Sequence, residues 1–238
     1  MTIRAQWLDN VLFYEESATG EAVRVIAPVS FYDDFLMGTT TSDFKAWLTR
    51  DAGAATETVV RNTANAVAVL ALDATNEIQV AGIDWGDDRP WILNQGLVIE
   101  FRFRFTTLPT GSVVAVLGLC GNHNAAVNTI AESIWFRADG SGAITVETDD
   151  TVNETSQVAT GVTLAANAWA IGRIVVESTA AVRFYLNGTR VASATTFNMS
   201  QVAALALQPV ARIGKEVAAT TVGTLQVDYV RCWQRRAA

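Results

Sequence analysis

The carboxylates best spaced to act together on a substrate lie in the segment Val-Glu-Thr-Asp-Asp, where Glu147, Asp149 and Asp150 are the candidates. Hydrolysis of a glycosidic bond uses two carboxyl groups across a sugar, one as acid and one as nucleophile or base. The polar run at residues 151–156 follows at once, which favours a solvated strand end. Glu100 has no glutamate two to four positions away. We therefore expect no catalytic acid pair.

The sequence also lacks the residue patterns of nucleophilic and metal-assisted catalysis. The single histidine, His123, lies in Gly-Asn-His-Asn, a loop by composition, and no Gly-x-Ser-x-Gly motif is present. Cys120 and Cys232 are far apart in apolar, strand-like runs, so we expect two buried free thiols. No ligand pair has the close spacing of a zinc site. The sequence predicts no catalytic residue and no metal centre, hence a protein that is not an enzyme.

One acidic loop has the composition of a ligand-binding site. Asp84, Asp87 and Asp88 fall within Ile-Asp-Trp-Gly-Asp-Asp-Arg-Pro-Trp, and carboxylate oxygens suit calcium, the one cofactor we consider. Trp85 and Trp91 flank these acids and could stack on a sugar ring. The alternative is an exposed polar loop held in place by its two tryptophans, because tryptophan more often packs in a core or an interface.

Composition restricts the partners. Half of the 238 residues are apolar and 17% are charged, so a large core can form. The net charge is -7 and no long basic cluster occurs, which disfavours nucleic-acid binding. No window approaches the roughly 20 apolar residues of a membrane span. The first ten residues lack the apolar core of a signal peptide, so we expect synthesis in a cytoplasm and no membrane partner.

Alternating apolar runs broken by turn residues predict an all-β sandwich. In residues 96–106, Phe101, Phe103 and Phe105 should share one face, with arginines on the other. The apolar run 112–120 predicts a strand covered on both faces. Further strands are expected at residues 54–60, 66–72, 77–83, 134–138, 143–148, 169–177, 182–186, 189–194 and 225–233.

Three local expectations complete the element assignment. In the last strand, Leu225, Val227, Tyr229 and Trp233 should lie on one face, with Gln226 and Asp228 on the other. Residues 198–207 could form one short helix, capped by Asn198 or Ser200. The first 28 residues precede the sandwich pattern. Their apolar residues have helical spacing, followed by a strand at 22–27. We therefore divide the chain into an N-terminal arm, 1–28, and a sandwich domain, 29–238.

Several motifs together resemble the concanavalin A-like/laminin-G-like jelly-roll structural proteins of tailed bacteriophages, of the capsid decoration or cement type. The resemblance implies a jelly roll of two antiparallel sheets. The motifs are Phe31-Tyr32-Asp33-Asp34-Phe35, Trp47, the small residues 52–55, GLVIEFRFRF at 96–105, RFYLNGTRVA at 183–192 and LQVDYVRCW at 225–233.

The resemblance implies a virion protein that binds and stabilises the phage head lattice at the capsid surface. Its partners would be the major capsid protein and copies of itself, as a trimer in preference to a dimer. We expect the arm to contact the neighbour through Trp7, Leu12, Phe13 and Tyr14. The alternative is a carbohydrate-binding module of a phage tail or fibre, recognising host glycans with the acidic loop. A third hypothesis is a glycoside hydrolase that depends on Glu147.

Overall fold

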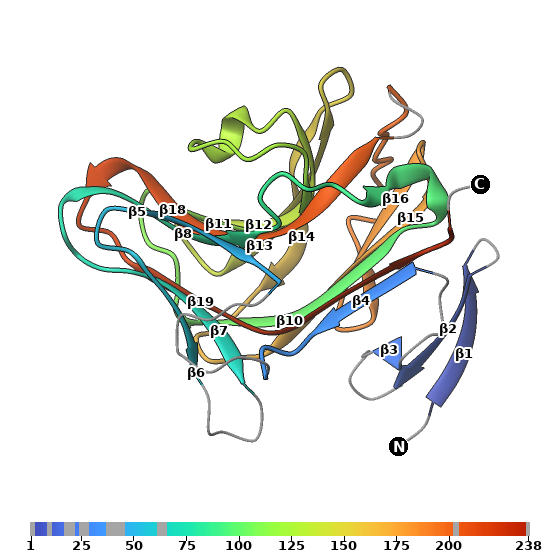
Figure 1. Ribbon diagram of the computed structural model, residues 1–238, viewed down its shortest axis with the longest axis horizontal. Helices are drawn as coiled ribbons and strands as arrows, with labels where there is room; N and C mark the ends of the chain where they lie inside the picture. Colours follow the sequence, from blue (N-terminus) through green and yellow to red (C-terminus); the bar gives the residue numbers. More distant parts are fainter. Residues whose placement is uncertain are drawn as a thin grey trace.

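A computed structural model of the chain describes residues 3–8, 11–16, 22–23, 29–36, 46–60, 66–201 and 205–236; for the first three segments it describes the backbone alone. Two large antiparallel sheets stack face to face, as Figure 1 shows. In the described residues the only helical turns are η1 (Leu93–Gln95) and η2 (Val127–Thr129). None is long and apolar enough to cross a membrane. The all-β, jelly-roll prediction is confirmed.

The strand order defines the two faces used below. Sheet I contains, in spatial order, β17 (Thr189–Val191), β16 (Ala181–Leu186), β15 (Ala170–Ser178), β10 (Val98–Thr107), β19 (Gly223–Gln234), β7 (Val67–Leu72) and β6 (Thr56–Val60), with β4 (Val29–Asp33) also paired to β19. Sheet II contains β14 (Thr155–Thr163), β13 (Ala143–Asp150), β12 (Glu132–Asp139), β11 (Val113–Cys120), β18 (Ala206–Ala219), β8 (Glu77–Asp84) and β5 (Leu48–Ala52), with β9 (Trp91–Ile92) on β18.

Aromatic side chains from both sheets form the centre of the core. Phe101 of sheet I meets Phe136 of sheet II edge-to-face, with ring centroids 5.7 Å apart. Phe136 in turn meets Phe184 at 5.4 Å, and Phe184 meets Phe197 at 4.9 Å. Each such pair contributes about 0.5–1.5 kcal/mol beyond the area it buries. These contacts hold the two layers in a fixed relation and so position the outer faces.

The predicted strands are present, but the facing of the last one is partly wrong. Val227 lies in the core as expected, whereas Tyr229 lies on the outer face, where its hydroxyl donates to Glu100. A β-bulge causes the change. Arg102 pairs with Tyr229 and Phe103 pairs with Val227, so Asp228 is the extra residue of the bulge. The extra residue reverses the alternation beyond it. Val230 and Cys232 therefore point into the core and Trp233 points out.

Both helix predictions are wrong where the structure describes the chain. Asn198 caps no helix; its carboxamide accepts a hydrogen bond from the Ser200 amide, and β18 begins at Ala206. Residues 202–204 lie outside the described residues. In the arm, β1 (Ile3–Leu8) and β2 (Val11–Glu16) pair antiparallel, and β3 (Ala22–Val23) joins them. Asp9 and Asn10, residue types typical of turns, separate the two runs and were the missed signal.

Candidate functional site

The outer face of sheet II gathers most of the chemistry-bearing side chains singled out in the sequence. Ile134, Phe136 and Ala138 of β12 point into the core, so Trp135 and Arg137 point outward. The same alternation places Glu147 and Asp149 of β13, Arg212 of β18 and Asp84 of β8 on this face. The face therefore carries a row of charged groups from strands that are distant in sequence.

The segment 121–131, which connects β11 to β12, lies over the middle of this face. Val127 and Ile130 of the segment pack against Trp135 in a second apolar cluster. That cluster also contains Val116, Cys120 and Val210. Trp135 is only 1% exposed as a result. The chain thus covers the centre of its own outer face, and the remaining polar groups lie along the two margins of the segment.

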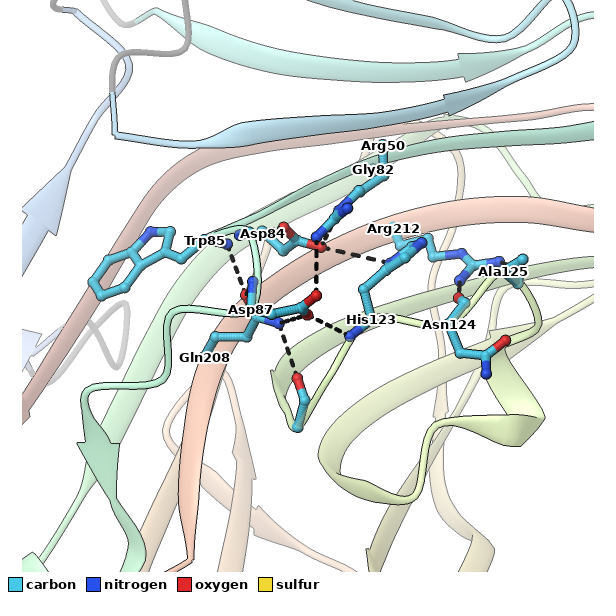
Figure 2. Close-up of polar contacts among 12 residues, drawn as sticks. Arg50, Gly82, Asp84, Trp85, Asp87, His123, Asn124, Ala125, Gln208 and Arg212 are labelled. Carbon is cyan, nitrogen blue, oxygen red and sulfur yellow. Dashed lines mark hydrogen bonds and ion pairs between the residues drawn. The ribbon is translucent and has the colours of Figure 1, made fainter.

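Arg212 and Gln208 of β18 fasten one margin of the segment (Figure 2). The Arg212 guanidinium, 1% exposed, donates to the carbonyl of Asn124 at 2.6 Å and to the carbonyl of Ala125. The Gln208 side chain donates to the carbonyl of Gly121 at 2.9 Å and accepts from the amide of Trp85. Donors on the strand therefore satisfy carbonyl groups that a loop would otherwise leave without partners.

Asp84 contacts Arg50 and His123 beside this margin, as Figure 2 shows. Its Oδ2 lies 2.8 Å from Arg50 Nε and 3.5 Å from His123 Nδ1. Burial, followed by the positive charge of Arg50, lowers the pKa of His123, so its ring is neutral at pH 7. Burial opposes ionisation of Asp87, but hydrogen bonds from the His123 amide and Gln208 outweigh it and lower the Asp87 pKa. The network is an internal clamp with its charges already paired.

The structure separates the members of the predicted glycan or calcium loop. Asp84 is 1% exposed and paired with Arg50, and Asp87 holds His123 and Gln208, whereas Asp88 is exposed. Trp91 is 2% exposed, and Trp85 packs against the core, 6.0 Å from Trp91. A sugar ring has no open face on Trp91. Among the described residues, no three His, Cys, Asp or Glu side chains converge to hold a metal ion.

Glu147 and Asp149 occupy the other margin of the segment. Arg137 Nη1 lies 3.5 Å from Glu147 Oε2 and donates to Asn128 Oδ1 at 2.7 Å, so it links the carboxylate to the covering segment. Burial raises the pKa of Glu147, although Arg137 partly opposes this, and nearby Glu154 raises it further. Burial also raises the pKa of Asp149. Two carboxyl groups with raised pKa values thus share one face and one strand.

Asp150 has a structural role in the loop after β13. Asp150 accepts hydrogen bonds from Val152, Asn153 and Gln201. These bonds outweigh the effect of burial and lower its pKa, so it organises the loop after β13.

Cys120 and Cys232 are free and buried, as predicted, and burial raises the pKa of both thiols. Neither thiol is a reactive nucleophile.

Sequence reasoning found Glu147 and Asp149 but missed their partners. Arg137 was not singled out. It alternates with Ile134 and Phe136 in the run 134–138, and this alternation places it on the outward face of the strand. The link between Asp84 and His123 had no local signal, since 39 positions separate them and only strand pairing unites them. The side chains of Trp7, Leu12, Phe13 and Tyr14 lie outside the described residues.

Solved structures of known proteins share this sandwich. A β-1,3-glucanase from Mycobacterium marinum superposes with a TM-score of 0.56 at 18% identity, covering 85% of this chain and 97% of its own. A GH16 protein of the Bacteroides ovatus mixed-linkage glucan locus gives 0.61 at 11%, covering 84% and 98%. The carbohydrate recognition domain of Emp47p gives 0.55 at 7%, covering 81% and 90%. Such identities show the fold alone.

These structures overturn one expectation. The sequence predicted a protein that is not an enzyme, yet the sandwich is one that glucanases also use, so the fold gives no ground for excluding catalysis. The lack of a histidine-based triad does not exclude it either, because glycosidases use two carboxyl groups. Among curated proteins the sequence has no match. A family model, however, matches residues 79–237. The chain belongs to the concanavalin A-like lectin/glucanases superfamily.

Proposed function

We propose that this protein is a glycan-recognising domain whose site lies on the outer face of sheet II, at the margin formed by Glu147, Asp149 and Arg137. The observation that carries the proposal is the shared outward facing of the two carboxylates beside a buried arginine. Carboxylates and guanidinium groups offer the paired acceptors and donors that sugar hydroxyl groups require. Membership of a lectin and glucanase superfamily supports this choice of ligand.

Each residue has a distinct part in this proposal. Asp149, partly exposed, accepts hydrogen bonds from sugar hydroxyl groups at the rim. Glu147 lies deeper, at 7% exposure, and becomes accessible to a ligand when Asn128 releases Arg137. Arg137, held also by Asp139 at 2.9 Å, keeps the Glu147 side chain in one orientation. The margin of segment 121–131 is therefore the entrance to the site.

Glycoside hydrolysis is the second candidate, and the raised pKa of Glu147 favours a role for it as the acid. A carboxylic acid with a raised pKa keeps its proton to a higher pH and can donate it to a leaving glycosidic oxygen. A second carboxylate on the same face can then serve as the base or the nucleophile. In this reading Glu147, more buried and beside Glu154, is the acid and Asp149 is its partner.

A glycan array followed by a reducing-end assay tests both candidates. Glu147→Gln and Asp149→Asn should each lower glycan affinity about tenfold, since each removes a charge-assisted hydrogen bond. Any release of reducing ends should disappear with Glu147→Gln. Asp88→Asn is the matched control, because it removes an exposed carboxyl group from the loop after β8. Loss of binding in Asp88→Asn, with Glu147→Gln unaffected, would place the site in that loop instead.

The virion role stays a separate proposal, with the major capsid protein and copies of the chain as partners at the capsid surface. It depends on the resemblance of the sequence motifs and on the aromatic residues of the arm. Deletion of residues 1–28 should abolish binding to capsids while the sandwich keeps its thermal transition. Unchanged capsid binding by the truncated chain would contradict the role of the arm.

A further inference from the structure

The outer faces of the two sheets carry opposite charge. On sheet II, three arginines accompany five carboxylates, whereas on sheet I six arginines accompany three carboxylates. The sheet II groups are Arg50, Arg137, Arg212, Asp84, Asp139, Glu147, Asp149 and Glu216; the sheet I groups are Arg102, Arg104, Arg173, Arg183, Arg190, Arg231, Glu100, Glu177 and Asp228. A chain of net charge -7 thus keeps a positive face.

One part of this positive face is built around Trp169, just before β15. The guanidinium groups of Arg102 and Arg104 both lie 4.4 Å from the centre of the Trp169 ring. Cation–π contact and the regular spacing of the two arginines on β10 hold them in place. Arg102 is also neutralised, because its Nη1 lies 2.7 Å from Asp228 Oδ2. Its charge is therefore already satisfied within the protein.

Unlike Arg102, Arg104 has no carboxylate partner among the residues that the structure describes. Its Nε donates to the side-chain oxygen of Gln226 at 2.8 Å. Within the described part of the chain, nothing accepts from its two terminal nitrogens, which form a fork that can bind two oxygens of an oxyanion. Because Gln226 uses its oxygen on Arg104, its amide nitrogen remains as a donor beside the fork. The arrangement offers donors without a competing acceptor charge.

We infer that Arg104, Gln226 and Trp169 form a second saccharide site on the outer face of sheet I, one that takes the carboxylate or sulfate group of an acidic sugar. The fork of Arg104 binds the oxyanion, and the Gln226 amide donates to it. Trp169 prevents the arginine side chain from moving away. The choice of a saccharide rests on the proposed function; the choice of an anion rests on the charge and donors of this face.

The site is independent of the carboxylate margin, because it lies on the opposite sheet. The excess of carboxylates on the outer face of sheet II disfavours an acidic sugar, whereas the face around Arg104 attracts it. The two sites should therefore divide glycans by charge. Acidic polysaccharides should bind through sheet I, and neutral ones through sheet II.

Calorimetric titration of the full chain with polygalacturonate, dextran sulfate and neutral dextran tests the inference. The wild-type protein should bind both acidic polymers at low salt. Arg104→Gln should lower the affinity for both polymers about tenfold. Arg190→Gln, which removes an exposed arginine from the same face, is the matched control and should lose less than twofold. Arg104→Lys keeps the charge but removes the fork, so it should bind more weakly than the wild type.

Each contrary outcome is distinct. No binding of either acidic polymer by the wild type, or equal losses in Arg104→Gln and Arg190→Gln, overturns the inference. Wild-type affinity in Arg104→Lys overturns the fork geometry and leaves only unspecific attraction. If neutral glycans bind and Glu147→Gln abolishes that binding while Arg104 makes no difference, the inference fails and the proposed function stands. If only acidic polymers bind, through Arg104, the sheet II site fails and this one stands.

Discussion

Glu57 of β6 should make the stability of the sandwich fall as the pH rises through neutrality. Its side chain points between the sheets, where Oε1 accepts a hydrogen bond from the Gly82 amide of β8. Burial, reinforced by the negative charge of Asp51, raises the pKa of Glu57 from 4.5 to about 7. Glu57→Gln keeps an acceptor for the Gly82 amide but removes the charge, and so isolates the effect of ionisation.

The sign and size of the effect follow from linkage. Between pH 4.5 and pH 7 the folded state holds a proton that the unfolded state has released, so the free energy of unfolding decreases as the pH rises. A fully buried group with this rise in pKa would lose roughly 3 kcal/mol. Because Glu57 is only partly buried, solvent screening reduces the expected loss to ~1–2 kcal/mol.

Urea denaturation of the wild type and Glu57→Gln at pH 5 and pH 8 measures this loss. At pH 5 the two proteins should have similar free energies of unfolding, and at pH 8 the variant should be more stable by ~1–2 kcal/mol. Other ionisable groups are common to both proteins and cancel in the difference. Asp88→Asn, the control, removes an exposed carboxyl group outside the core. An equal difference for Glu57→Gln at both pH values would refute the reasoning.

Three further substitutions test the covering segment and the sheet beneath it. Arg212→Met leaves two carbonyl groups without donors, so unfolding free energy should fall by ~2–4 kcal/mol in urea titrations. Asn128→Ala should cost less than ~1.5 kcal/mol, yet speed hydrogen exchange across residues 121–131, because Arg137 loses its hold on the segment. Gly118→Ala places a Cβ 2.2 Å from the Ile134 carbonyl oxygen, so the melting temperature should drop in calorimetry by an amount equivalent to ~3 kcal/mol. A variant that melts like the wild type would contradict the corresponding contact.

The sequence predicted those features that depend on neighbouring residues. The period of two in residues 96–106 predicted the core-facing phenylalanines of β10, and Asn187-Gly188 predicted the turn, in which both residues have positive φ, 49° and 75°. The bulge at Asp228 was not predictable, because an extra residue in one strand is defined by its partner strand. The clamp between Asp84 and His123 depends likewise on how distant strands are paired, and the sequence carries no local sign of it.

The way segment 121–131 is held argues that the sheet II site is opened locally rather than by movement of the two sheets. The sheets share a continuous apolar core, so separating them would expose a large apolar area. The free energy required would exceed the total stability of a typical domain. The segment, by contrast, buries Val127 and Ile130 and otherwise depends on hydrogen bonds with side chains at its two margins. On the β18 side these include a bond from the Val127 amide to Glu216. At the β18 margin the donors are buried, and one of them, Arg212, is charged, so their release costs more free energy. At the β12 margin a single bond from Arg137 reaches the exposed Asn128. Opening should therefore begin at Asn128, next to Glu147, which is where a glycan has to enter if the carboxylates are to reach it.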